Sequence, residues 1–76
     1  MKVGQKVYFI SSDEDGRAII VCGVVSQKTT KETEIERIES YCVRYGGGEL
    51  LGLREEGILF DSVEELIKDL KRRIVL

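Results

Sequence analysis

The stretch RAIIVCGVVSQKTTKETEIERIESYCVRY, residues 17–45, decides the fold of this chain. It contains two runs rich in β-branched and aromatic residues, 17–27 and 35–45, joined by a polar turn of threonine, lysine and glutamate. Runs of this kind on either side of turn residues are typical of antiparallel strands. The stretch therefore predicts one long β-hairpin, to which the other segments of the chain are added.

The two predicted strands of this hairpin differ in pattern. The first is almost wholly apolar, which is typical of a strand that crosses a core and bends, and Gly23 marks the expected bend or bulge. The second alternates cleanly from Tyr41 to Tyr45 but not before Ser40, which predicts a bulge near Glu39. The half nearer the turn is charged, and we expect it to extend beyond the core as a twisted ribbon.

Three shorter segments predict further strands, at residues 3–10, 49–54 and 58–60. Glycines at 46–48 predict a tight turn between the hairpin and the strand that follows it. The segment 3–10 is apolar on both faces, which indicates that both are at least partly covered, as in a small closed barrel.

A C-terminal helix is expected over residues 63–74. Ser62 and Glu65 match a capping box, and basic residues stand at the expected C-terminal end. We expect its apolar side chains to be buried together in the core. These side chains are Val63, Leu66, Ile67, Leu70 and Ile74.

The predicted fold class is therefore α+β: a strongly bent antiparallel sheet or small partly open barrel of four to five strands with one C-terminal helix. The chain has 76 residues, which corresponds to one domain, here spanning 1–76. It contains no apolar run of roughly 20 residues and no apolar leader, so a cytoplasmic protein without a membrane segment is expected.

The composition argues against several classes of function. The formal charge is −2, from 12 basic and 14 acidic residues, which does not favour a general nucleic-acid binder. Histidine, the commonest general base and a frequent metal ligand, is absent. No nucleophile–base pair is recognisable, so we expect no enzyme, no catalytic residue and no cofactor.

Two local patterns resemble ligand-binding loops but lack the residues that define such loops. The acidic segment 11–16 lacks the alternating carboxylates and the terminal glutamate of a calcium-binding loop. Glycines 46–48 are followed by neither the helix nor the lysine of a phosphate-binding loop. Both segments are interpreted as turns, and no metal site is expected.

Cys22 and Cys42 form a candidate redox pair. If the hairpin turn centres near Glu32, these two cysteines stand opposite each other on adjacent strands. The favoured interpretation is two buried thiols that serve as small apolar groups. A regulatory or structural disulfide is the alternative, and a metal site is least supported because no further ligand completes the shell.

The chain resembles Src-homology-3-like small barrels in its opening, Val3-Gly4-x-x-Val7-Tyr8-Phe9, and in its long bent strand. Its ending, Leu59-Phe60-x-Ser62-x-Glu64-Glu65-Leu66, is similar to that of small uncharacterised proteins of Gram-positive bacteria and their phages or mobile elements. This resemblance implies a fold and a bacterial setting, and it carries over no functional residues.

The charged hairpin favours a non-catalytic binding module that contacts a protein partner through this hairpin or a sheet edge. The candidate interaction residues are Lys28, Lys31, Glu32, Glu34, Glu36, Arg37, Tyr41 and Tyr45. The turn acids are interpreted either as a solvated edge or as a surface for a basic partner.

Two alternative hypotheses concern other partners. A nucleic-acid-associated accessory protein would use Arg17, Arg37, Arg44 and Arg54 with the tyrosines, and is not favoured. A self-associating protein would pair through an open edge strand.

Overall fold

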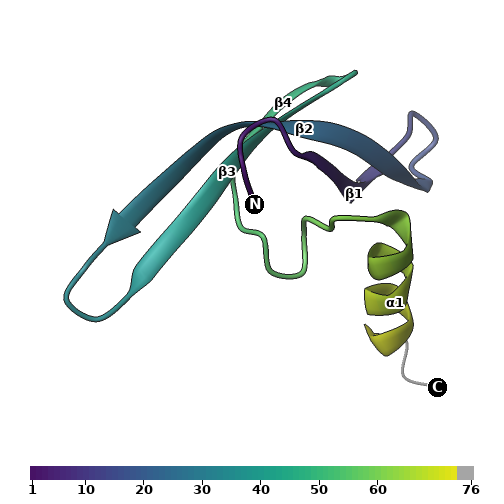
Figure 1. The fold of residues 1–76 in the computed structure, drawn as a ribbon. Coiled ribbons are helices and arrows are strands. Elements are labelled where there is room, and N and C mark those ends of the chain that lie inside the picture. The colour runs from purple at the N-terminus through teal and green to yellow at the C-terminus, as the bar shows by residue number, and fades with distance from the viewer. Residues whose placement is uncertain (74–76) are drawn as a thin grey trace.

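The structure, a computed structural model, describes residues 1–73, in which four strands and one helix are present (Figure 1). Their order is β1 (Lys6–Ser12), β2 (Ala18–Glu32), β3 (Arg37–Tyr45), β4 (Gly48–Leu53) and α1 (Val63–Arg73). The strands form one antiparallel sheet in the order β1-β2-β3-β4, so each strand pairs with its neighbour in sequence. The sheet is bent and not closed, and the predicted α+β class is confirmed.

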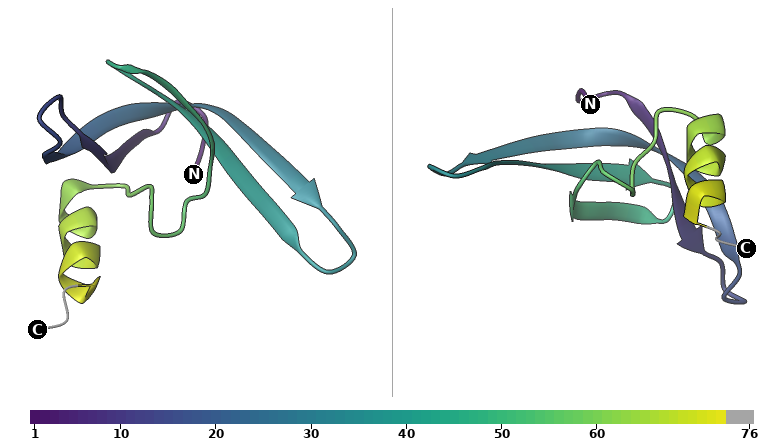
Figure 2. Two further views of the ribbon diagram at one scale, coloured as in Figure 1. Left: turned by 180° about the vertical axis from the view of Figure 1, so that it is seen from behind. Right: turned by 90° about the horizontal axis from the view of Figure 1, so that it is seen from below.

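The hairpin of β2 and β3 is the longest feature of the sheet. One end packs in the core, and the other projects away from the helix (Figures 1 and 2). Its turn is held at Thr33 and Glu36: the Thr33 N–H donates to the Glu36 carbonyl at 2.8 Å, and the Glu36 N–H donates to Thr33 Oγ1 at 3.1 Å. The turn therefore lies beyond Glu32, where the sequence had placed its centre.

A bulge in β2 bends the hairpin where it leaves the core. The pairing of β2 with β3 shifts between Val25 and Gln27, so Ser26 is the extra residue. The Ser26 hydroxyl lies within hydrogen-bond distance of two acceptors, Glu49 Oε1 at 2.8 Å and the Cys42 carbonyl at 3.2 Å, which holds the bulge in place. The predicted bulge near Glu39 is wrong, because Glu39 pairs regularly with Thr30. Gly23 also pairs regularly, with Val7, and is not itself bulged.

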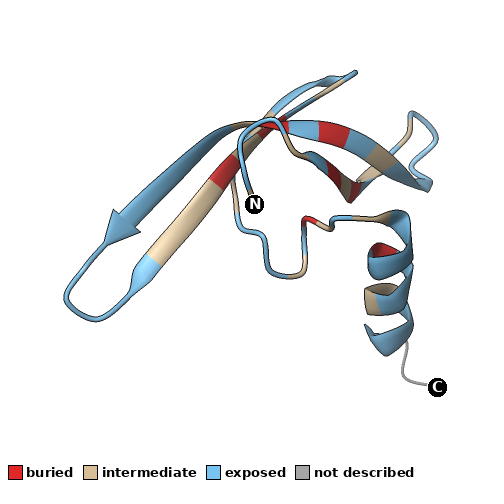
Figure 3. Ribbon diagram, viewed as in Figure 1, coloured by how far each residue is buried: buried red, intermediate tan, exposed pale blue. Residues whose placement is uncertain are grey.

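The core lies on one face of the sheet and is formed mainly by residues of β1, β2 and β3 (Figure 3). Its buried residues are Val7, Phe9, Val25, Tyr41, Val43 and Leu59. Leu59 comes from the irregular segment after β4, which runs beneath the sheet (Figure 1). The rings of Phe9 and Tyr45 meet edge to face with centroids 5.4 Å apart. The hairpin base is therefore core, as the apolar pattern predicts.

The predicted fifth strand at 58–60 is reduced to a single bridge. The Tyr8 N–H donates to the Phe60 carbonyl at 2.8 Å, and the Phe60 N–H donates to the Tyr8 carbonyl at 3.0 Å. One bridge covers only the middle of the outer edge of β1. The sheet consequently stays open instead of closing into a barrel.

The helix begins where the capping signal predicts. Ser62 Oγ accepts a hydrogen bond from the Glu65 N–H at 3.2 Å, which satisfies one of the first-turn amides. The helix lies at the β1 end of the sheet (Figure 1), and Leu66 is its one buried side chain. Val63 and Ile67 remain 37% and 39% exposed, so the expectation that the whole apolar stripe is buried is wrong. Ile74 and the predicted helix end lie outside the described residues.

Candidate functional site

The outer half of β3 has an edge that no strand of residues 1–73 covers. β4 ends at Leu53, which pairs with Tyr41, whereas β3 continues for residues 37–40. These four residues pair with β2 on one side only. Because alternate residues of a strand direct their backbone N–H and C=O groups to the same side, two of the four present these groups away from β2. The edge can therefore accept another strand.

A hollow of about 220 Å³ lies beside this edge. Residues 36–39 and Tyr41 line it from the hairpin, and residues 54–56 line it from the segment after β4. We call it the hairpin slot. Its lining carries four glutamates and two arginines, an excess of two negative charges. The slot therefore combines a free strand edge with a surplus of carboxylates.

Glu39 is the most constrained side chain of the slot. The Tyr41 hydroxyl donates to its Oε2 at 3.2 Å, and Lys28 Nζ and Arg37 Nη2 lie 3.7 Å and 3.3 Å from its Oε1. The hydrogen bond from Tyr41, aided by the two cations, lowers the pKa of Glu39. Burial, and then the bond to Glu39, raises the pKa of Tyr41. The Glu39 carboxylate is therefore already bound by Tyr41, Lys28 and Arg37, and its bond to Tyr41 links the hairpin to the core.

The other acids of the slot are more available. Within residues 1–73, neither Glu36 nor Glu56 forms an ion pair, and both are exposed. Glu55 Oε2 lies 3.9 Å from the amino group of Met1. An incoming cation can therefore bind Glu36 or Glu56 without breaking an ion pair within the described residues.

The structure places the predicted interaction residues in three environments. Lys31, Glu32, Glu34 and Glu36 are exposed near the hairpin turn, and Arg37 pairs with Glu32 at 3.5 Å. Lys28 is partly covered, with its ammonium 5.8 Å from the centre of the Tyr41 ring. Tyr41 is only 1% exposed, so its ring offers no free surface, and Tyr45 is partly buried against the core.

Residues 54–56 belong to the slot but were not expected there. They follow β4 in an irregular segment, and no periodic pattern connects them with β3. The only sequence signal is the adjacency of Glu55 and Glu56 to a strand end, and such a pair of acids is common on protein surfaces.

The predicted pairing of Cys22 with Cys42 is wrong. Cys22 stands opposite Tyr8 on β1, whereas Cys42 stands opposite Gln27. The later turn shifts the register away from the predicted one, and the bulge at Ser26 offsets only a small part of this shift. Both thiols are free; Cys22 is exposed and Cys42 is partly exposed, so neither is the buried thiol that the sequence suggested.

The arginines of the nucleic-acid hypothesis lie in different parts of the chain, although Arg37 and Arg54 both line the hairpin slot. Arg17 lies in the loop between β1 and β2, where it pairs with Asp13 at 3.3 Å and Asp15 at 2.8 Å. Arg37 lies at the far end of the hairpin and pairs with Glu32 and Glu39. The charges of Arg17 and Arg37 are therefore separated from each other and paired with neighbouring acids. Arg44 and Arg54 form no ion pair within residues 1–73.

The acidic segment 11–16 is a turn from Asp13 onward, as expected, whereas Ser11 and Ser12 belong to β1. Asp13 Oδ1 accepts hydrogen bonds from the Asp15 and Arg17 N–H groups at 2.9 Å and 2.8 Å. Among residues 1–73, no three histidine, cysteine or acidic side chains gather as metal ligands would. In the same residues, no helix has the length and apolar character needed to cross a membrane.

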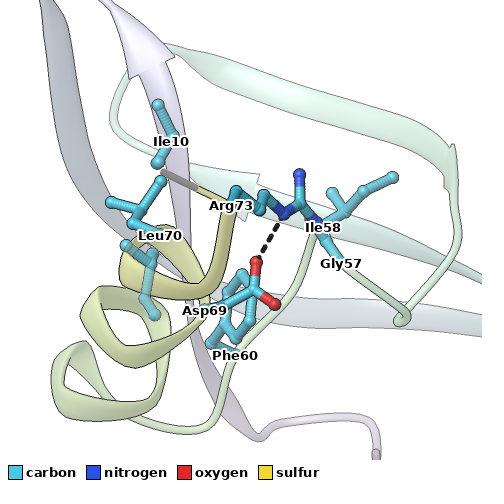
Figure 4. Close-up of a pocket in the computed structure, with 8 residues that line it drawn as sticks. Ile10, Gly57, Ile58, Phe60, Asp69, Leu70 and Arg73 are labelled. Atoms are coloured by element: carbon cyan, nitrogen blue, oxygen red, sulfur yellow. Dashed lines mark hydrogen bonds and ion pairs between the residues drawn. The ribbon is translucent and has the colours of Figure 1, made fainter. Parts of the chain in front are cut away.

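A second hollow, of about 200 Å³, lies among α1, Ile10 of β1 and the segment 57–60 (Figure 4). Ile10, Phe60 and Leu70 supply much of its apolar lining. At its rim Arg73 Nε lies 2.9 Å from Asp69 Oδ2, and Arg73 Nη2 donates to the Gly57 carbonyl at 3.1 Å. The guanidinium of Arg73, the last basic residue of the described helix, is therefore bound by other residues of the chain.

Comparison of the chain with protein-family models, with curated proteins and with solved structures found no match.

Proposed function

We propose that this chain is a non-catalytic binding module that takes an extended, basic segment of a partner protein along the free edge of β3. The observation that carries the proposal is the termination of β4 opposite Tyr41 while β3 continues beside the slot. A partner strand in line with β4 would pair with the unused backbone groups of residues 37–40. This is recognition by strand addition, in which main-chain bonds give affinity and side-chain pockets give specificity.

The charge of the slot supports a basic partner. Glu36 and Glu56 lie on opposite sides of the slot, one on the hairpin and the other after β4. A lysine or arginine of the added strand would reach either carboxylate without breaking an existing ion pair. Such complementary charges mainly raise the association rate and exclude acidic competitors.

The biological setting is part of the proposal. We place the chain in the cytoplasm of a Gram-positive bacterium, or on one of its phages or mobile elements. The support is the resemblance of its opening and its ending to small Src-homology-3-like proteins, together with two free thiols that suit a reducing compartment.

The proposal is tested by removing the outer half of the hairpin. Residues 30–39 are replaced by Asn-Gly, which joins Thr29 to Ser40, two residues that already stand opposite each other. We expect the shortened chain to stay folded, because six buried core residues lie outside the removed segment. It should lose the partners that the intact chain captures from a native extract.

A charge variant tests the slot itself. Glu56→Lys should weaken capture of the same partner, whereas Glu14→Lys should not, because Glu14 is an exposed acid of the distant β1–β2 loop. Unchanged capture by both the shortened hairpin and Glu56→Lys would contradict the proposal. Salt-dependent retention on DNA, lost in Arg44→Ala, would support the nucleic-acid alternative instead.

A further inference from the structure

The face of β1 and β2 that points away from the core carries an apolar patch. Strand alternation places Tyr8 and Ile10 of β1 on this face, opposite to Val7 and Phe9. Tyr8 pairs with Cys22, and Ile10 pairs with Ile20, so these four side chains are neighbours across the two strands. Val24 continues the row along β2. We call these five residues the outer patch.

The outer patch is unusually open for its composition. Ile10, Ile20 and Val24 are 43%, 44% and 40% exposed, and Cys22 is also exposed. None of the five residues is charged. Lys6 and Arg44 stand beside Val24 on the adjacent strands, so charge begins only at the border of the patch. An apolar centre with a charged rim is typical of a protein interface.

The architecture explains why the outer patch is open. A sheet needs a covering layer on each apolar face, and here the segment carrying Leu59 covers only the core face. On the other face, α1 contacts β1, and Leu66, Phe60 and Ile10 line the same hollow (Figure 4). The helix thus leaves Ile20, Cys22 and Val24 of β2 exposed.

We propose that the outer patch is the interface of a homodimer, in which two copies pack their β1–β2 faces against each other as a two-layer sandwich. A second copy is the occupant that fits because homodimer interfaces are more apolar than interfaces between different proteins. Since the patch centre has no charge, a two-fold contact places no like charges together there. The hollow beside α1 is continuous with the patch through Ile10, so it can receive a side chain of the second copy.

Light scattering coupled to size-exclusion chromatography tests the dimer, with loading from about 1 to about 500 µM because dimer populations depend on concentration. We expect the mass to rise toward twice 8.6 kDa. Ile20→Lys should raise the dimer Kd by roughly a hundredfold or more, because it would bury an unpaired ammonium. The control Ile35→Lys changes an isoleucine that is 95% exposed at the hairpin turn, and it should leave the dimer intact.

Cross-linking keeps the test decisive if Ile20→Lys fails to fold. Cys22 lies within the patch, so a short bis-maleimide should link two copies of a Cys42→Ser chain and should not link two copies of a Cys22→Ser chain. A wild-type chain that stays monomeric throughout, or a dimer that Ile20→Lys leaves unchanged and Cys22 does not cross-link, would overturn the proposal. A monomer that instead binds a different protein through this face would overturn it as well.

This inference is independent of the hairpin slot. The shortened-hairpin variant described above should still form the dimer, because the outer patch lies on β1 and on β2 before the bulge. Loss of partner capture with an intact dimer, or the reverse, would therefore separate the two proposals.

Discussion

Gly23 and Val43 approach each other more closely than any larger residue at position 23 would allow. A Cβ atom built on Gly23 would lie 2.6 Å from Val43 Cγ1, 3.0 Å from the Arg44 carbonyl oxygen and 3.3 Å from Phe9 Cε1. Val43 and Phe9 are core residues, so neither can move without disturbing the packing. Gly23 is needed for close approach in the core, and its backbone is not in a left-handed conformation.

We expect Gly23→Ala to lower the free energy of unfolding by about 1–3 kcal/mol, the usual cost of overpacking a core. Alanine favours a strand slightly over glycine, so a purely local effect would have the opposite sign. Gly46→Ala is the matched control, because a Cβ there meets nothing within 4 Å. Urea titrations of the two variants measure the difference. Equal midpoints would show that the sheet adjusts without cost.

Glu39 predicts a dependence of stability on pH. Its pKa is lowered in the folded chain from the ordinary value of 4.5, chiefly by the hydrogen bond from Tyr41. A carboxyl group with a lowered folded-state pKa contributes stability above its unfolded pKa and loses it as the pH falls through the folded one. We therefore expect the stability gap between wild type and Glu39→Gln to shrink as the pH falls below 4.5.

Thermal unfolding of both chains at neutral and acid pH measures this gap. Glu36→Gln is the control, because Glu36 has no ion pair within residues 1–73. A gap that stays constant from pH 7 to well below 4.5 would contradict the role assigned to Glu39.

Ser62 caps α1 and gives a third prediction. Its Oγ accepts from the Glu65 N–H at 3.2 Å, so Ser62→Ala leaves a first-turn amide without this partner. We expect a loss of about 1 kcal/mol in the free energy of unfolding. Ser12→Ala, at the exposed end of β1, should change it much less. The two midpoints in urea should differ, and identical values would mean that water replaces the hydroxyl.

The elements were predictable where local chemistry decides them. The hairpin follows from its β-branched runs, and the helix begins at Val63 as the Ser62 cap predicts. The register was not predictable, because the turn lies at Thr33–Glu36 and nothing in the polar run around it marks its centre. The extra residue at Ser26 then changes the pairing again without breaking the apolar pattern of β2. The slot was only half predictable. Its hairpin side carries the expected acids. Its other side is formed by residues 54–56, which belong to an irregular segment without a periodic sequence pattern.

The register also decides the chemistry of the two cysteines. Cys22 pairs with Tyr8 and Cys42 pairs with Gln27, so the chain should not form an internal disulfide. We expect both thiols to remain alkylatable after a dilute sample is treated with a mild oxidant, as measured by mass spectrometry of the intact chain. Gln27→Cys in a Cys22→Ser background places a thiol opposite Cys42, and this variant should become oxidised under the same conditions. An internal Cys22–Cys42 disulfide in the wild type would contradict the register of β2 and β3, because closing it requires the two strands to slide by several residues relative to each other.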